Sequence, residues 1–385
     1  MRHLLLFTAA CLGVSSTVAF SQHRTTHGKP VTEKPPVAEK SSAWPAQMEL
    51  RVPFEPTVFP NGHRSYLLYE LCLTNFGSNP HTLSRIDVMD GDSPITGFDA
   101  EQLKTIVQPV GRGVNDAKDR LVIGGGQSVL VFMEVSLDRT ARVPGKLTHR
   151  VVAADTTLTG AEIDTHHTRL HLFGPPLEGG EWLAADAPSN EEENHHRRGV
   201  VALDGRLADS RRYAIDWKKV RDGASFSGDA RDVHSYFSYG EPVFAVAEGR
   251  VVTTKDNLPE NVPGHGDAFH PAVPITLETV GGNRITLDLG GGQYAYYMHL
   301  QPGSLRVKPG DRVRRGEMLA RVGASGDARE PHLHFEVTTS PRLIFGDGVP
   351  YVIERYRSKS GNDAAATIHL RDLPRNNELV TFEGK

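Results

Sequence analysis

The chain of 385 residues contains only two cysteines, and one of them, Cys11, lies in an apolar N-terminal segment. If that segment is removed, Cys72 alone remains, and one thiol cannot form a disulfide within the chain. The sequence therefore predicts that hydrophobic cores stabilise the protein. Cys72 stands in the alternating run SYLLYELCLTNF, which is typical of a buried structural thiol, and a nucleophilic role is the alternative.

Long apolar runs are also missing. After the N-terminus, no segment approaches the ~20 consecutive apolar residues that a transmembrane helix needs, so we expect no transmembrane segment. Residues 1–21 combine a basic start, a short apolar run from Leu4 to about Val18, and small residues at the spacing that signal peptidase prefers. They predict a signal peptide and an exported protein, periplasmic or extracellular. A lipid anchor on Cys11 is an alternative that its sequence context disfavours.

The chain carries little net charge, a formal −4, and no basic run in it alternates with aromatic residues. The electrostatic pattern of a nucleic-acid-binding protein is therefore missing, and we expect no nucleic-acid partner. The oligomeric state stays open.

A sustained helical period is absent, and the pattern changes along the chain. Residues 22–47 are rich in Pro, Lys, Thr and Ser, which predicts a disordered tether. Residues 48–173 show apolar alternation with a period of two, broken by turn clusters, which predicts an immunoglobulin-like β-sandwich. The turn-rich, acidic residues 174–198 are predicted to form a linker.

The remaining segments are also predicted to be β-structure. Residues 199–340 contain short strands broken by Asp-Gly, Glu-Gly and Gly-Asp pairs, which predicts a compact domain of antiparallel hairpins. Residues 341–385 are predicted as a C-terminal extension of one or two strands without an assigned role. The predicted fold class is therefore all-β.

The motif PHLHFEV carries the first candidate site residues, His332 and His334. Side chains at i and i+2 of a strand point to the same face, so both imidazoles would project together while Leu333 enters the core. One imidazole could bind a metal, and the other could transfer a proton. An isolated His-x-His motif often occurs by chance, so its context decides its meaning.

Three further stretches supply that context: RRYAIDW with Asp216, YAYYMHL with His299, and GDRVRRGEMLARVGASG just before the His-x-His motif. In this order the set resembles the lysostaphin/LytM-type zinc endopeptidases of bacterial cell walls, over about residues 206–337. The resemblance implies a LytM-type antiparallel β domain and a Zn²⁺ cofactor. It implies Asp216 and His334 as zinc ligands, and His332 and His299 as the catalytic pair.

The same resemblance implies the reaction. A zinc ion lowers the pKa of its bound water toward ~7, which makes hydroxide available at neutral pH. His332 would take the proton of that water, and His299 would stabilise the oxyanion or the leaving amine. The implied substrate is a peptide bond in peptidoglycan cross-links or stem peptides, and the sequence does not decide which bond is cut.

One residue departs from the family pattern. Four residues before Asp216, where the family has a histidine, this chain has Arg212. A guanidinium group stays protonated near neutral pH and cannot bind zinc. Either another residue supplies the missing ligand, or the site is inactive.

The histidine pair His195 and His196 is the candidate replacement. An Asp-Gly pair at 204–205 predicts a hairpin, and antiparallel counting from it brings the pair beside Arg212. The counted partners are Leu203 with Arg206, Arg197 with Arg212, and His195 with Ala214. His195 would share the face of Asp216, and one β-bulge would exchange it for His196. A subset of relatives that resembles this chain pairs an HRR-like stretch with R[FY]AIDW, which favours His196.

Two alternative functions compete with a zinc endopeptidase. A catalytically inactive LytM-like protein that binds or regulates the cell wall would also fit the loss of a histidine at residue 212. The GDRVRRGEMLARVG stretch resembles the hairpins of biotinyl carriers, but the hairpin lacks the lysine that such carriers need. We predict no ligand role for the remaining loop and domain-edge histidines, which are His166, His167, His234, His265 and His270.

Overall fold

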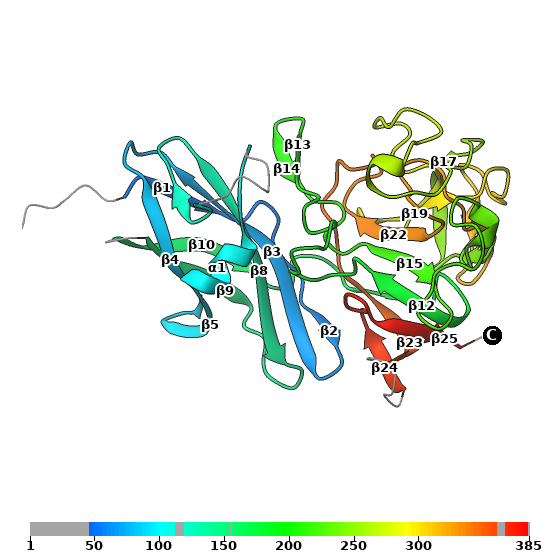
Figure 1. Cartoon of the computed structure of the whole chain (residues 1–385). Helices are drawn as coiled ribbons and strands as arrows, with labels where there is room; N and C mark the ends of the chain where they lie inside the picture. Colours follow the sequence, from blue (N-terminus) through cyan, green and yellow to red (C-terminus); the bar gives the residue numbers. More distant parts are fainter. Residues whose placement is uncertain (1–45, 112–118, 154–155, 360–365, 384–385) are drawn as a thin grey trace, which may run out of the picture. The chain divides into compact units, whose positions relative to one another are not determined.

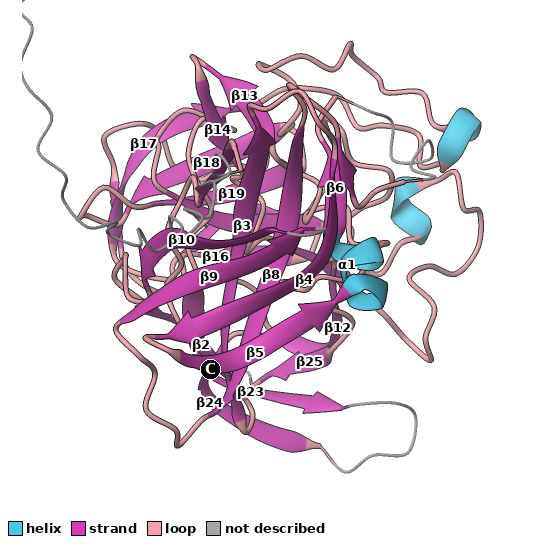
Figure 2. Cartoon of the chain, turned by 90° about the vertical axis from the view of Figure 1, so that its left-hand side faces the viewer, coloured by secondary structure: helices cyan, strands magenta, loops and turns pink. Residues whose placement is uncertain are grey.

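The computed structural model describes residues 46–111, 119–153, 156–359 and 366–383. The predicted signal peptide, with Cys11, and the predicted tether up to residue 45 lie outside the described residues. Strands dominate the described chain (Figure 2), which confirms the predicted all-β fold class. Within these residues, no helix is long and apolar enough to cross a lipid bilayer.

The N-terminal part forms two five-stranded sheets (Figure 1). The first has the order β1-β3-β8-β6, and β2 pairs with β3. Its strands are β1 (Met48–Arg51), β2 (Phe59–Asn61), β3 (Arg64–Asn75), β6 (Val107–Pro109) and β8 (Ser128–Asp138). The second has the order β10-β9-β4-β5, and β7 pairs with β4. Its strands are β4 (His81–Asp90), β5 (Ser93–Asp99), β7 (Val122–Ile123), β9 (Lys146–Ala153) and β10 (Thr156–Asp164).

Alternating side chains from both sheets share one buried core, so this part is a β-sandwich. Leu67 pairs with Val135 and Leu71 with Val131 in the β3–β8 ladder, and all four are buried. Cys72 is a free, buried thiol in β3, as expected. A short helix that the sequence did not predict, α1 (Ala100–Ile106), begins with a capping box, in which the side chains of Asp99 and Gln102 each accept the backbone N–H of the other residue.

The C-terminal part is built on an 11-stranded sheet with the order β11-β23-β25-β12-β15-β22-β19-β18-β17-β20, and β24 pairs with β23. In chain order, its first six strands are β11 (His171–Phe173), β12 (Gly179–Ala185), β15 (Ile215–Lys219), β17 (Gly249–Lys255), β18 (Asn283–Asp288) and β19 (Tyr294–Leu300). The others are β20 (Arg312–Val313), β22 (Leu333–Thr338), β23 (Tyr351–Lys359), β24 (Thr367–Asp372) and β25 (Leu379–Phe382).

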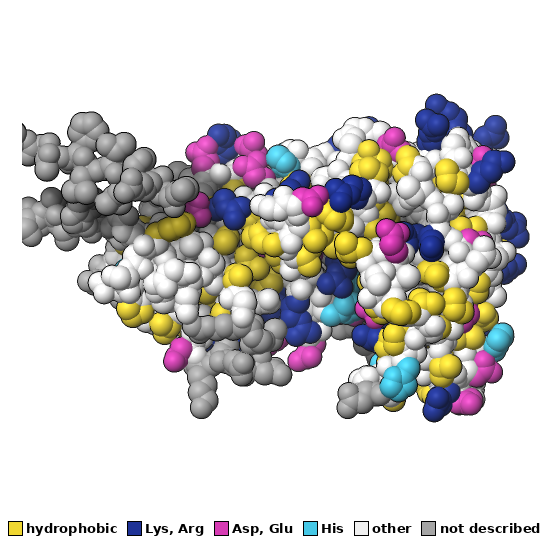
Figure 3. Space-filling view, turned by 90° about the horizontal axis from the view of Figure 1, so that it is seen from above, with side chains coloured by type: hydrophobic (Ala, Val, Ile, Leu, Met, Phe, Trp, Pro, Cys, Tyr) yellow, Lys and Arg dark blue, Asp and Glu magenta, His cyan; other side chains and the backbone are white. Residues whose placement is uncertain are grey.

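Smaller elements surround this sheet. They are the pair β13 (Val201–Leu203) and β14 (Arg206–Ala208), the pair β16 (Pro242–Phe244) and β21 (Met318–Arg321), and the 3-10 turns η2 (Val233–Ser235) and η3 (Gly266–Ala268). Figure 3 shows acidic and basic side chains interspersed on one face of the molecule.

Several strands of the large sheet come from outside the predicted residues 199–340. Strand β12 lies in the predicted linker, β23 to β25 lie in the predicted extension, and β11 lies at the end of the predicted sandwich segment. In β12, Trp182 and Ala184 are buried, and the strand pairs with both β15 and β25. Its two glycines and its turn-rich flanks concealed this short alternation in the sequence.

Candidate metal centre

Three neighbouring strands, β15, β22 and β19, bring the candidate residues together. Asp216 of β15 lies directly opposite His334 of β22, so both side chains project from the same face. His332 precedes β22 by one residue, and His299 lies near the end of β19, the next strand along. The imidazole rings of His299 and His332 are 4.8 Å apart between centroids.

His299 reaches this face because its backbone breaks the strand alternation. Met298 lies opposite His334, so regular alternation would send the next side chain to the other face. His299 instead has a φ of 61°, in the left-handed region that is sparsely populated by residues other than glycine. Its side chain lines the same cavity as Met298, and such strained residues cluster at functional sites.

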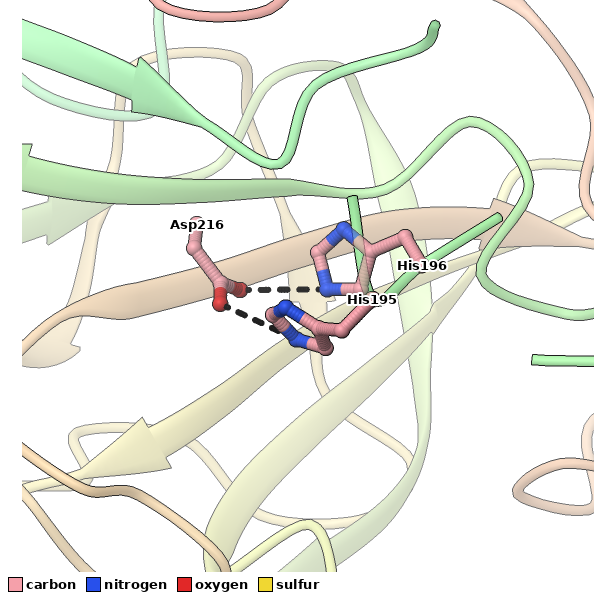
Figure 4. Close-up of side chains that lie close together, drawn as sticks. All are labelled: His195, His196 and Asp216. Carbon is pink, nitrogen blue, oxygen red and sulfur yellow. Dashed lines mark ion pairs between the residues drawn. The ribbon is translucent and has the colours of Figure 1, made fainter. Parts of the chain in front are cut away.

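The Asp216 carboxylate lies at the centre of the cluster. Its Oδ1 is 2.8 Å from His334 Nδ1, and 3.5 Å from the Nε2 atoms of both His332 and His196. Its Oδ2 is 3.7 Å from His195 Nε2. Figure 4 shows His195 and His196 side by side, facing this carboxylate. These side chains line a cavity of about 540 Å³.

His196 is the side chain whose surroundings point most clearly to a metal. Its Nδ1 donates to the Asp186 carbonyl over 2.8 Å, so the neutral ring presents the lone pair of Nε2 to Asp216. Within the described residues, that buried Nε2 has no hydrogen-bond partner. Burial lowers the pKa of His196 to about 3, which keeps the ring neutral. A lone pair facing a carboxylate oxygen is unfavourable unless a cation lies between them.

His332 and His299 are held in a similar way. His332 Nδ1 donates to the Glu330 carbonyl and His299 Nδ1 to the Ser325 carbonyl, each over 2.8 Å. Both rings are buried. Burial and the neighbouring imidazoles hold the pKa of His299 well below its usual range. In its neutral form each ring therefore presents an unprotonated Nε2.

His334 differs because both of its nitrogens face carboxylates. Nδ1 donates to Asp216, and Nε2 lies 3.1 Å from Glu336 Oε2. Burial lowers the pKa of His334, but these two carboxylates outweigh burial and raise it to about 9. Burial likewise raises the pKa of Asp216, and the surrounding histidines outweigh it and hold that pKa well below its usual range. Asp216 is therefore ionised at neutral pH.

Arg212 points away from this cluster. Its Nε donates to Glu70 Oε1 over 2.7 Å, Nη1 to the Ser189 carbonyl over 2.9 Å, and Nη2 to Asn190 Oδ1 over 2.5 Å. The side chain is 3% exposed. The side chain binds the sandwich strand β3 and the segment before His195.

The predicted hairpin forms but is shorter than predicted. Strands β13 and β14 pair Leu203 with Arg206, as predicted, but the ladder ends at the pair Val201 and Ala208. Residues 195–198 form a turn, so the predicted pairs of Arg197 with Arg212 and of His195 with Ala214 are wrong. Asn194 causes the difference because its Oδ1 accepts the backbone N–H groups of His196 and Arg197, which favours the turn over a strand.

Sequence reasoning missed several polar partners of the cluster. Glu336 could have been found, since it follows His334 by two residues in the same strand and so shares its face. Asp186 holds the turn that carries the histidine pair: its Oδ1 accepts the His195 N–H, and its carbonyl accepts from His196. Among the histidines without a predicted ligand role, His265 lines the cavity, and His234 is exposed and contacts Asp232.

Comparisons with known proteins show which family part of the chain resembles. Residues 232–344 match the model of Peptidase family M23. The match contains His299, His332 and His334 and begins after Asp216. It supports a peptidase of this family for that part of the chain.

Two curated relatives that resemble part of the chain are endopeptidases. The chain is 30% identical over 114 residues to the glycyl-glycine endopeptidase ALE-1 of Staphylococcus capitis, over 29% of this chain and 25% of the relative. It is 29% identical over 105 residues to the peptidoglycan DD-endopeptidase ShyB of Vibrio cholerae, over 27% of this chain and 19% of the relative. The matches thus span a quarter or less of these relatives.

Solved structures give weaker likenesses. A mutant catalytic domain of the prophage-encoded M23 protein EnpA from Enterococcus faecalis has a TM-score of 0.26 and 19% identity, over 47% of this chain and 93% of that chain. The catalytic domain of lysostaphin from Staphylococcus simulans has a TM-score of 0.23 and 22% identity, over 38% of this chain and 80% of that chain. Both TM-scores are low.

Proposed function

We propose that the protein is an exported, zinc-dependent endopeptidase that hydrolyses peptide bonds of peptidoglycan cross-links or stem peptides. The observation that carries the proposal is the buried Nε2 of His196, which has no hydrogen-bond partner among the residues that the structure describes and is aimed at the ionised carboxylate of Asp216 beside His334. The M23 match and the peptidoglycan endopeptidases among the relatives supply the substrate class.

Among the described residues, the ligand atoms of His195, His196 and Asp216 all lie within 4.8 Å of one another, close enough to hold one metal ion, and His334 Nδ1 lies 2.8 Å from Asp216 Oδ1. Two imidazoles and one carboxylate are the donor set of a catalytic zinc site with an open fourth position, provided that His334 gives up its Nδ1 proton when the ion binds. Zn–N bonds of about 2.0–2.1 Å in a tetrahedron separate the ligand atoms by roughly 3.3 Å. The distances from Asp216 Oδ1 to His334 Nδ1 and His196 Nε2 bracket this value. We therefore propose His196, Asp216 and His334 as the ligands, with His195 as the alternative to His196.

A bound zinc ion would polarise the carbonyl group of the substrate and lower the pKa of a bound water. The chain supplies the proton transfers. His332 is held through Nδ1, and its Nε2 lies near Asp216 at the cavity, so it can accept a proton there. His299 also presents an unprotonated Nε2, so it can donate to an oxyanion or a leaving amine only after it has gained a proton.

The inactive, wall-binding alternative has one observation in its favour, which is Arg212 at the position of a family ligand. Purified protein separates the two functions through its zinc content and its hydrolysis of isolated peptidoglycan. The proposed enzyme binds one zinc ion per chain and releases soluble peptides. A protein that binds peptidoglycan but contains no zinc and does not hydrolyse it would support the inactive alternative.

A further inference from the structure

We propose that Arg212 is a positioning residue that fastens the turn bearing His195 and His196 to the N-terminal sandwich, so that the sandwich is part of the scaffold of the metal site. This inference rests on the proposed function, because it concerns the geometry of that site. The segment of residues 189–198 is called the ligand turn below.

The guanidinium of Arg212 joins three separate parts of the chain. Arg212 lies just before β15, the strand of Asp216, and it donates to Glu70 of the sandwich strand β3. Its other two bonds go to the ligand turn, at the Ser189 carbonyl and the Asn190 side chain. One planar group therefore sets the distance between the Asp216 strand, the ligand turn and the sandwich.

The ligand turn has further anchors on the sandwich. Asn190 Nδ2 donates to the Phe132 carbonyl of β8 over 2.6 Å. The Arg197 guanidinium lies 4.9 Å from the centroid of the Phe132 ring, and its Nη1 donates to the Thr105 carbonyl of α1 over 3.2 Å. The same Nη1 donates to the Asn190 carbonyl. The turn is thus held by side-chain contacts to two sandwich elements.

These contacts matter because the ligand turn lies outside the described strands. Residues 186–200 lie between the end of β12 and the start of β13 and belong to neither strand. Fixing the backbone in one conformation costs conformational entropy, so an unsupported turn would populate many conformations. His196 would then leave the position that faces Asp216. The Arg212 bonds keep the turn in one conformation.

A lysine at position 212 tests this role without removing the charge. It can still pair with Glu70, but its single ammonium cannot reproduce the planar fork that also holds Ser189 and Asn190. Arg212→Lys is expected to weaken zinc binding by about 10- to 100-fold, the range for residues that orient metal ligands. Asn190→Ala, a milder change in a half-buried side chain, is expected to weaken it in the same direction.

The matched control is Arg375→Lys. Arg375 also contacts the sandwich from the C-terminal part, since its Nη2 donates to Glu134 over 2.9 Å and its guanidinium lies 4.1 Å from the Tyr66 ring centroid. Its substitution is expected to lower the melting temperature as Arg212→Lys does, and to leave the zinc dissociation constant unchanged.

A double-mutant cycle shows whether Arg212 acts through His196. The zinc dissociation constant is measured for the wild type, Arg212→Lys, His196→Ala and the double variant, with enough added zinc to saturate the weakened sites. If Arg212 positions His196, its substitution has little further effect once His196 is absent. Equal losses with and without His196 would overturn the inference, and so would wild-type affinity in both Arg212→Lys and Asn190→Ala.

A different result would contradict the proposed function. A wild-type protein that binds no zinc would remove the metal site altogether, and the positioning role with it. A wild type that binds zinc through His196, while the Arg212 and Asn190 variants bind as tightly, would leave the proposed function intact and overturn this inference alone.

Discussion

His334 connects metal binding to pH. Its pKa of about 9 exceeds the value near 6.5 of a free imidazole, because Asp216 and Glu336 hold the protonated form. In the metal-free protein this proton stabilises the folded state fully below about pH 6.5, and the contribution is lost as the pH rises through about 9. Zinc must displace the same proton from Nδ1.

Zinc affinity should therefore rise with pH. We expect it to increase about tenfold per pH unit between pH 7 and 8.5, with release of about one proton per zinc bound, because one proton competes with the ion. Calorimetric titrations in buffers of different ionisation enthalpy measure this proton release. A pH-independent affinity would show that His334 is not a ligand.

Alanine substitutions of His332 and His334 should have different effects on zinc binding and on hydrolysis. His334→Ala should abolish both zinc binding and hydrolysis. His332→Ala should keep most of the zinc and lose about 10²- to 10⁴-fold in kcat, the usual contribution of a general acid or base. His167→Ala, in an exposed side chain before β11, is the neutral control for both measurements. Loss of zinc in the His332 variant would assign His332 to the ligand set.

Glu336 should support the site without binding the metal. It is 1% exposed, and its Oε2 faces His334 Nε2. Glu336→Gln keeps the size of the side chain but removes the charge that orients and polarises the ring. We expect zinc binding to weaken by about 10- to 100-fold, measured by competition with a chelator. Unchanged affinity would contradict this supporting role.

At the scale of elements, the site depends on strand β22. Phe335 lies between His334 and Glu336 and points into the core, where its ring contacts Phe173, Tyr297 and Tyr351. Phe335→Ala should lower the free energy of unfolding by about 3–5 kcal/mol through the cavity it leaves. Denaturant unfolding measures this loss, with Ile368→Ala as the control because Ile368 is 51% exposed on β24. A loss below about 1 kcal/mol would contradict the packing argument.

Local sequence patterns predicted some features of the strands correctly. Period-two spacing placed His332 and His334 on one face, and the Asp-Gly pair set the register of β13 and β14. The structure differs from the local patterns where distant residues decide the conformation. Strand β12 is stabilised by pairing with β15 and β25, which no local pattern shows, and the turn at residues 195–198 depends on the side chain of Asn194.

For the molecule as a whole, the sequence indicated which residues could meet but not what holds them. Asp216, His299, His332 and His334 were identified by motif and resemblance, and the structure brings all four together with His196. The role of the sandwich was not predictable, because Arg212 and Glu70 are 142 positions apart. Ion pairs over such separations leave no periodic signal in one sequence.

The central claim is that His196 supplies the ligand that Arg212 cannot. The most direct measurement is the zinc content of the purified wild type and of His196→Ala by elemental analysis, at neutral pH after dialysis against metal-free buffer. The account predicts one zinc ion per wild-type chain and little or none in the variant. Full zinc occupancy in His196→Ala would contradict it.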